Sequence, residues 1–224
     1  MICFIMFEIN KNIKMKDYII IMADIIDSRN SDQKNLMNHF KHLTKEVNHS
    51  SKQRLLSPIT ITLGDEFQGI AEDVESAVKL IFDLEEKIIQ QRAGFKLRYV
   101  IFEGAIDTPI NKLNAYEMLG EGLTHAREAL DEYKSSDYRC YFHLKDKKKS
   151  DALTHSLFVY QSIIDEWKVQ RDYDLISNFI TLKDYKKVAD ESGKTRSQIW
   201  KREKSLKIKE YFSCKSLINY VAER

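Results

Sequence analysis

Proline and glycine are scarce in this sequence, with two prolines and seven glycines among 224 residues. Collagen-like and low-complexity disordered chains contain far more of both, so a chain with a packed core is expected. The cysteines Cys3, Cys140 and Cys214 are too far apart for a metal-ligand spacing, which predicts reduced thiols in a cytoplasmic protein. No apolar run reaches the ~20 residues that span a bilayer, so no membrane partner is expected.

A strong charge of one sign is also missing from the chain as a whole, because the formal net charge is only +2. The charge is unevenly distributed, however. Residues 181–224 contain 12 Lys or Arg against 6 Asp or Glu, whereas the preceding 180 residues contain 24 against 28. A basic tail behind an acidic body is typical of a protein whose tail meets a polyanion. DNA is therefore the predicted partner of residues 181–224.

The apolar pattern of the first two thirds of the chain predicts an α+β domain. Apolar, β-branched runs indicate strands, and apolar residues at helical spacing indicate helices between them. Their order, strand, helix, hairpin, helix, strand, then helix and strand, is that of a ferredoxin-like arrangement. The predicted strands are 18–24, a hairpin at 59–71, 96–102 and 138–144, and the predicted helices are 32–49, 73–92 and 120–133.

The character of the sequence changes at a charged stretch, 145–151, which is interpreted as a solvated linker. An apolar stripe after it predicts a connector helix over 152–170. Residues 1–14 are expected either to come from an upstream start codon or to add an edge strand. The predicted organisation is an α+β domain over 15–145, a charged linker and connector helix over 146–180, and a small all-α helix-turn-helix domain over 181–224.

The stretch 185–204 has the spacing of a helix-turn-helix. Ala189 is small where two helices must approach, Gly193 suits the turn, and Ile199 belongs on the inner face of the second helix. Thr195 is the expected N-cap of that helix, because a Thr side chain can accept a hydrogen bond from a free backbone amide.

This spacing resembles that of bacterial helix-turn-helix regulators, which implies that the second helix enters the major groove. Arg202 departs from the resemblance, since such motifs usually carry an aliphatic residue there, and Trp200 or Leu206 is expected to fill the core instead. A small helical domain with an ordinary basic face, or a protein-docking module, is the alternative. The residues expected to contact DNA are Thr195, Arg196, Ser197, Gln198, Lys201, Arg202, Lys204, Lys207 and Lys209.

Two aspartates, Asp24 and Asp65, each follow a run of apolar, β-branched residues. If the two runs form neighbouring strands, both carboxylates lie at one edge of the sheet. With the backbone carbonyl of Ile25, they could hold Mg²⁺ or Mn²⁺, cations that bind nucleotide phosphates. Asp27 and Glu66 are further candidates, and strand alternation predicts that Glu66 points away from Asp65. Alternatively, Asp24 is a helix cap and Asp65 an ordinary hairpin tip.

The segments 24–29 (DIIDSR) and 63–69 (LGDEFQG) together resemble the SatD family of bacterial proteins, and the resemblance extends to the helix-turn-helix. The first domain of that family is similar to class III and GGDEF-type nucleotide cyclases. The resemblance therefore implies a nucleotide-cyclase-like domain in which Asp24 and Asp65 hold the metal. The nucleotide contacts that it implies are Asp27, Arg29, Gly64, Glu66 and Arg127.

Some positions depart from the cyclase pattern. Leu63 replaces the first glycine of a GGDEF hairpin, which narrows the room for a nucleotide beside the backbone. Class III cyclases carry an asparagine four residues before the helix arginine, but here Leu123 precedes Arg127. Arg98 could meet phosphates, although a solvated strand face is the expected place for it. Metal and nucleotide binding is thus better supported than turnover.

The leading hypothesis is a SatD-like DNA-binding regulator whose first domain binds a metal–nucleotide ligand and reports it to the tail. The alternative is a metal-dependent nucleotidyl cyclase or nucleotidyltransferase, in which the same cations would promote phosphoryl chemistry. A second alternative is a catalytically inert dimerisation scaffold. Whether the chain forms a homodimer is left open.

Overall fold

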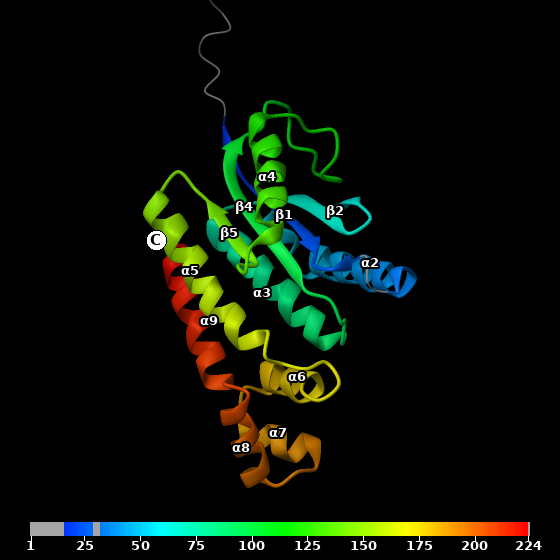
Figure 1. Ribbon diagram of the computed structural model, residues 1–224, viewed down its shortest axis with the longest axis vertical. Helices are drawn as coiled ribbons and strands as arrows, with labels where there is room; N and C mark the ends of the chain where they lie inside the picture. The colour runs from blue at the N-terminus through cyan, green and yellow to red at the C-terminus, as the bar shows by residue number, and fades with distance from the viewer. Residues whose placement is uncertain (1–15, 29–31, 224) are drawn as a thin grey trace, which may run out of the picture.

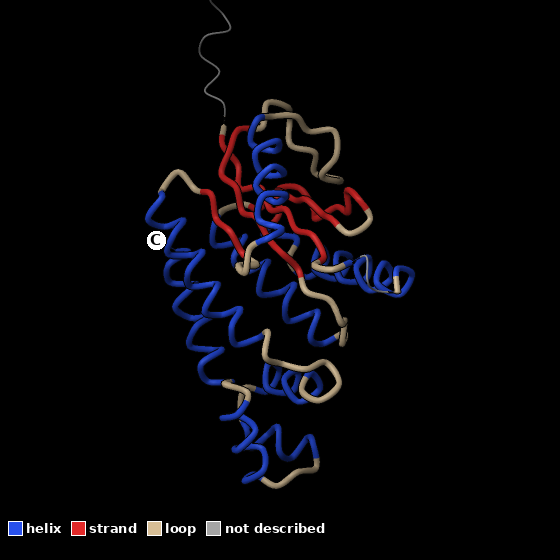
Figure 2. Tube along the Cα trace, viewed as in Figure 1, coloured by secondary structure: helices blue, strands red, loops and turns tan. Residues whose placement is uncertain are grey.

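The computed structural model describes residues 16–28 and 32–223 (Figure 1). The expectation for residues 1–14 and the predicted role of Arg29 lie outside these ranges. Within them, a five-stranded sheet lies between helices, and further helices extend from one end of it (Figure 2). This is the α+β class that the sequence predicts.

The sheet has the strand order β2-β3-β1-β4-β5. Neighbouring strands are antiparallel except β4 and β5, which are parallel. The first four strands and their helices follow the βαββαβ order of a ferredoxin-like domain, which confirms the predicted arrangement. The strands are β1 (Asp17–Ile25), β2 (Leu55–Leu63), β3 (Glu66–Ala71), β4 (Leu97–Ala105) and β5 (Cys140–His143).

β1 lies at the centre of the sheet and is buried on both faces. Ile19 and Ile21 belong to a core cluster with α2 (Gln33–Ser50) and α3 (Val74–Gln90) on one face. Ile20 and Met22 belong to a second cluster, formed with α4 (Glu121–Glu132) on the other face. Burial on both sides explains why the strand is an almost unbroken apolar run in the sequence.

The two helices α2 and α3, which pack on the same face of the sheet, each begin directly after an aspartate. Asp32 accepts hydrogen bonds from the backbone amides of α2, and Asp73 accepts one from the amide of Ser76 in α3. These side chains satisfy amides that have no partner within the helix. The helices therefore begin within one or two residues of their predicted starts.

Residues 147–223 form five helices. These helices share a core with the face of the sheet that α2 and α3 cover. The last helix runs back along α5, so that the C-terminus lies beside the start of α5 (Figure 1). Lys149 of α5 donates to the backbone carbonyl of Ala222 at 2.6 Å, and Tyr211 donates to Glu86 of α3 at 2.6 Å. The helices are α5 (Lys147–Ile164), α6 (Tyr173–Leu182), α7 (Tyr185–Ser192), α8 (Arg196–Ser205) and α9 (Ile208–Glu223).

The charged stretch 147–151 is helical, which corrects its interpretation as a solvated linker. Asp146 caps α5 by accepting a hydrogen bond from the backbone amide of Lys149, so the helix begins five residues before the predicted start. It also ends earlier, at Ile164, because residues 165–172 form turns.

Glycine is required where α4 crosses β4. A Cβ atom on Gly122 would lie 2.7 Å from the carbonyl carbon of Gly104 and 2.8 Å from the carbonyl oxygen of Ala105. We expect Gly122→Ala to force α4 away from the sheet and to lower the free energy of unfolding by roughly 1–3 kcal/mol, measured by urea denaturation. Gly64→Ala is the control, because its Cβ would have no atom within 4 Å, and a change within about 0.5 kcal/mol is expected. Equal losses in the two variants would contradict this account of the crossing.

Candidate functional site

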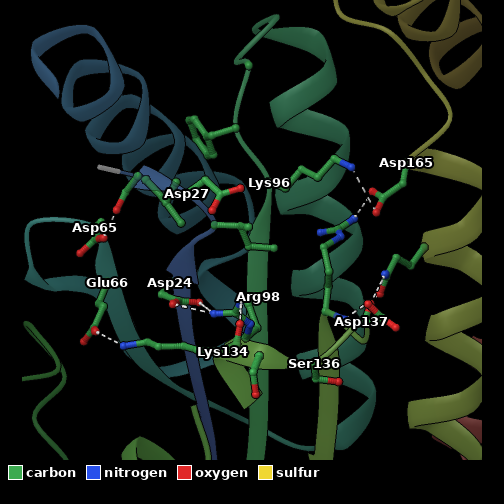
Figure 3. Close-up of a pocket in the computed structure, with 18 residues that line it drawn as sticks. Asp24, Asp27, Asp65, Glu66, Lys96, Arg98, Lys134, Ser136, Asp137 and Asp165 are labelled. Carbon is green, nitrogen blue, oxygen red and sulfur yellow. Dashed lines mark hydrogen bonds and ion pairs between the residues drawn. The ribbon is translucent and has the colours of Figure 1, made fainter. Parts of the chain in front are cut away.

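A cavity of about 1090 Å³ opens where β1 ends (Figure 3). Its walls are the loop after β1, the turn between β2 and β3, the start of β4, the segment 134–139 that leads into β5, and the end of α5. Both aspartates that the sequence predicts for a shared site, Asp24 and Asp65, line this cavity. The hairpin and the strand end therefore come together as expected.

Asp24 is held by an arginine on the neighbouring strand. The register of β1 against β4 places Asp24 directly opposite Arg98. Arg98 Nη1 donates to both carboxylate oxygens, at 2.9 and 3.2 Å, and Nη2 donates to the backbone carbonyl of Lys134 at 3.1 Å. Asp24 is 5% exposed and Arg98 7%. Burial raises the pKa of Asp24 above its ordinary value, and the positive charge of Arg98 opposes that rise.

The expectation that Arg98 lies on a solvated strand face is therefore wrong. β4 is an inner strand with β1 on one side and β5 on the other, so its side chains near this end are covered. The sequence gives no sign of the partner strand, because Asp24 and Arg98 are 74 residues apart.

Glu66 continues the same row of side chains on β3. Its cross-strand partner in β1 is Asp24. The carboxylate accepts a hydrogen bond from Arg127 Nη1 of α4 at 2.7 Å and lies 3.9 Å from Lys134 Nζ. Two residues expected to contact a nucleotide, Glu66 and Arg127, thus form an ion pair with each other, and their contact with a ligand stays a prediction.

Asp65 lies in the turn beside the loop after β1. The backbone amide of Ile25 donates to the carbonyl of Asp65 at 3.0 Å, and Ser28 Oγ donates to its carboxylate at 2.5 Å. The carboxylate of Glu66 is instead directed toward Lys134 (Figure 3), so the two side chains point to different neighbours, as strand alternation predicts. Gly64 and Asp27 are exposed next to this turn. Ser28 is a site residue that the sequence analysis missed, although it stands in the segment DIIDSR.

The predicted site for Mg²⁺ or Mn²⁺ does not fit this arrangement. Both oxygens of Asp24 accept hydrogen bonds from Arg98, so a cation at that carboxylate would meet a guanidinium. Across residues 16–28 and 32–223, no three or more His, Cys, Asp and Glu side chains are grouped so as to hold a metal ion. Asp65 and the carbonyl of Ile25 are the predicted ligands that remain, so a cation held by them would take its other oxygen ligands from water or phosphate.

The far wall of the cavity contains a second set of ion pairs that the sequence did not indicate. Asp165, at the end of α5, lies 3.0 Å from Arg139 Nη2 and 3.3 Å from Lys96 Nζ. Arg139 also binds Glu85 of α3 at 3.0 Å and is 5% exposed. Of the described residues, four cationic side chains and six carboxylates thus line the cavity, and each of these four cations is paired within the protein.

The second candidate region is the pair α7 and α8. Gly193 ends α7 with φ of +62°, a conformation that glycine adopts without strain. Ala189 and Ile199 are buried where the two helices meet, as expected. Thr195 caps α8 and forms a capping box with Gln198, which confirms the predicted N-cap. Leu206 fills the core beside them.

Most of the residues predicted to contact DNA are exposed on the first turns of α8. Trp200 is 41% exposed beside them, and Lys204 Nζ lies 3.8 Å from the centre of its ring. Arg202 is the exception, because it points inward and pairs with the buried Asp172 at 2.6 Å. Lys207 is paired with Glu166 at 3.0 Å. The exposed residues are Thr195, Arg196, Ser197, Gln198, Lys201 and Lys204, together with Lys209 in α9, which lies 3.9 Å from Glu203.

The model of the SatD family matches residues 18–220, which is nearly the whole chain. The chain belongs to the SatD family. The match includes both the cavity and the pair α7 and α8. No curated protein matches the sequence. No helix within the described ranges is both long enough and apolar enough to cross a bilayer.

Among solved structures, the chain is similar to nucleotide cyclases, the class named by the sequence resemblance. A bacterial light-regulated adenylyl cyclase is 13% identical, with a TM-score of 0.43 over 58% of this chain and 76% of that one. The guanylyl cyclase domain of the RhoGC fusion protein from the aquatic fungus Blastocladiella emersonii is 18% identical, with a TM-score of 0.40 over 57% and 79%. Both similarities cover little more than half of the SatD-family chain.

Residues 165–172, called the strap below, connect the cavity to α8. At one end Asp165 is part of the cavity wall. The residues after it contact the C-terminal end of α8 and the residue that follows: Trp167 Nε1 donates to the carbonyl of Leu206 at 3.0 Å, and Asp172 pairs with Arg202. The strap therefore joins the two candidate regions by direct contacts.

Asp172 anchors the strap and makes its stability depend on pH. Its pKa is lowered to about 2, first by hydrogen bonding from Arg171 and further by the backbone amide of Lys168 and by Arg202. A lowered carboxylate pKa contributes stability that is complete above the unfolded pKa of about 4 and is lost as pH falls through 2. We expect Asp172→Asn to lower the free energy of unfolding by roughly 1–3 kcal/mol at pH 7, and by about half as much at pH 3.

Urea denaturation at the two pH values measures this difference. Asp174→Asn is the matched control, because Asp174 is 72% exposed in its pair with Arg92, and an effect below about 0.5 kcal/mol is expected. A loss in Asp172→Asn that is the same at pH 3 as at pH 7 would show that the carboxylate charge is not what holds the strap.

Proposed function

We propose that this SatD-family protein is a cytoplasmic DNA-binding regulator in which α8 contacts DNA and the cavity binds a small ligand. The observation that carries the proposal is the exposed polar and basic surface at the start of α8, directly after the turn at Gly193. The opposite side of the same helix is fixed to the core by Ile199 and by the ion pair of Arg202 with Asp172.

The chemistry of this surface suits DNA. Arg196 can bind a guanine edge or a phosphate with two hydrogen bonds, and Ser197 is small enough to contact either. The Gln198 side chain is engaged in the cap through its oxygen, which leaves its amide group free to donate. Lys201 and Lys204 lie one and two turns further along and are placed for phosphates. Because Arg202 and Lys207 are paired internally, they are not part of the proposed DNA contact.

The charge of the cavity limits the form of its ligand. Among the described lining residues, six carboxylates face four paired cations, a balance that would repel a bare polyphosphate. The nucleotide predicted for this site is therefore proposed to enter as its complex with Mg²⁺, formed in solution, with the phosphate charge already reduced. Asp65 and Asp27 line the cavity, Gly64 precedes Asp65 in the turn, and these three residues are the proposed contacts.

The strap supports a link between ligand and DNA. A ligand that contacts Lys96 or Arg139 competes with Asp165, the first residue of the strap, for their charge. The contacts of Trp167 and Asp172 would carry a displacement of the strap to the end of α8. Linkage then requires the ligand and DNA to change each other's affinity by the same factor.

The DNA contact is tested by removing two charges from the surface of α8. We expect Arg196→Ala/Lys201→Ala to weaken binding to labelled random-sequence duplex DNA by at least about tenfold, because two phosphate or base contacts are lost. The slope of log K against log salt is expected to fall by about 2. Fluorescence anisotropy over a salt series measures both quantities.

The matched control removes two lysines from α2. Lys41 and Lys45 are exposed on that helix, so Lys41→Ala/Lys45→Ala changes the net charge by the same amount away from α8. It should leave the affinity within about twofold. Equal weakening in both double variants would indicate general electrostatic attraction and not a contact made by α8.

The ligand is tested by calorimetric titration of ATP and GTP in buffer with Mg²⁺, followed by anisotropy with and without the nucleotide that binds. We expect binding that Asp65→Ala abolishes, together with loss of the nucleotide's effect on DNA affinity. Asp151→Ala, which removes an exposed carboxylate of α5 outside the cavity, should behave as wild type. Chromatography of the mixture separates the alternatives: a product would identify a cyclase or transferase, and no binding of nucleotide or DNA would leave a scaffold.

A further inference from the structure

The ion pair of Asp24 and Arg98 is centred on one nitrogen of the guanidinium. A single nitrogen, Arg98 Nη1, lies within 3.2 Å of both carboxylate oxygens. This nitrogen therefore lies between the two carboxylate oxygens, where a cation bound by both of them would lie. The other terminal nitrogen is fixed from the opposite side by the carbonyl of Lys134.

The pair is held in place by the backbone. Asp24 and Arg98 are opposite each other in the β1–β4 register, and both side chains are more than nine-tenths buried. Arg98 Nε is itself buried without a hydrogen-bond partner in the described part of the chain. The guanidinium therefore stays beside Asp24 although one of its donors makes no hydrogen bond. Displacement of Arg98 would leave the buried carboxylate of Asp24 without its ion-pair partner, which costs free energy. A divalent cation and the guanidinium cannot share the same two oxygens.

We propose that Arg98 is the resident cation of this site, in the place that a divalent metal would otherwise occupy against Asp24. The chain then coordinates no metal through Asp24, with or without its ligand. Two-cation phosphoryl chemistry cannot be assembled here, because one of its two carboxylates is already neutralised. The inference does not depend on the proposed function, since it concerns the protein alone.

The test is the response of the protein to Mn²⁺ without nucleotide, measured as the thermal midpoint in Mn²⁺ and in EDTA and as Mn²⁺ bound by electron paramagnetic resonance. We expect Mn²⁺ to leave the midpoint of wild type within about 1 °C, and Asp24→Asn to bind no less Mn²⁺ than wild type. A rise of about 5–10 °C in wild type, the size expected from a site saturated 100-fold above its dissociation constant, that disappears in Asp24→Asn would overturn the proposal.

Removing the arginine should create the metal site. We expect Arg98→Met to bind Mn²⁺ at least about tenfold more tightly than wild type and to gain thermal stability from it, and Asp24→Asn/Arg98→Met to lose both gains. Lys96→Met is the matched control, because it removes one positive charge from the same cavity without contact to Asp24. A gain of Mn²⁺ binding in Lys96→Met equal to that in Arg98→Met would refute the specific role of Arg98, as would no gain in Arg98→Met.

Arg98→Met could also fail to fold when it leaves Asp24 unpaired. Folding that is restored by Mn²⁺ but not by the same ionic strength of NaCl would support the proposal. If the variant folds in neither condition, the comparison of wild type with Asp24→Asn decides, because it requires no substitution of the arginine.

Discussion

The register of β1 against its two neighbours is the constraint on which the rest of the site depends. It places Glu66, Asp24 and Arg98 side by side across three strands at one end of the sheet. Three charges in a row at a buried strand end are stable only if they pair, and the burial of Asp24 makes the guanidinium of Arg98 essential to that end. The carbonyl of Lys134 then fixes the segment before β5 against the same arginine, which closes one wall of the cavity.

A second dependence runs from the cavity to the helical part of the chain. The strap is short, and its polar groups are satisfied by the cavity at one end and by α8 at the other. α9 returns along α5 and packs on α3, so the part that carries α7 and α8 shares a continuous core with the sheet. The strap adds polar contacts between the cavity and the end of α8 to this shared core, and such contacts can exchange partners.

Local features were predictable from the sequence, whereas pairings between distant residues were not. The apolar run of β1, the hairpin tip at Asp65 and the capping box at Thr195 follow from patterns within a few residues. Arg98 and Arg202 were misjudged for one reason: each is a charged residue whose partner is remote in sequence, so it looks solvated or DNA-facing until the fold supplies a carboxylate. Ser28 and Asp165 were missed for a related reason, because their contacts are with neighbours that the fold brings to them.

The pairing of every cation among the described residues that line the cavity has a consequence for affinity. An anionic group can gain a contact with Lys96 or Arg139 only by taking it from Asp165, so part of its binding energy is used to break an existing pair. That cost weakens binding, but it also ensures that binding changes the strap. A cavity with an unpaired cation would bind the same ligand more tightly, but this binding would not displace the strap. The absence of a free cation among the described lining residues therefore suits a protein that reports the presence of its ligand better than one that stores it.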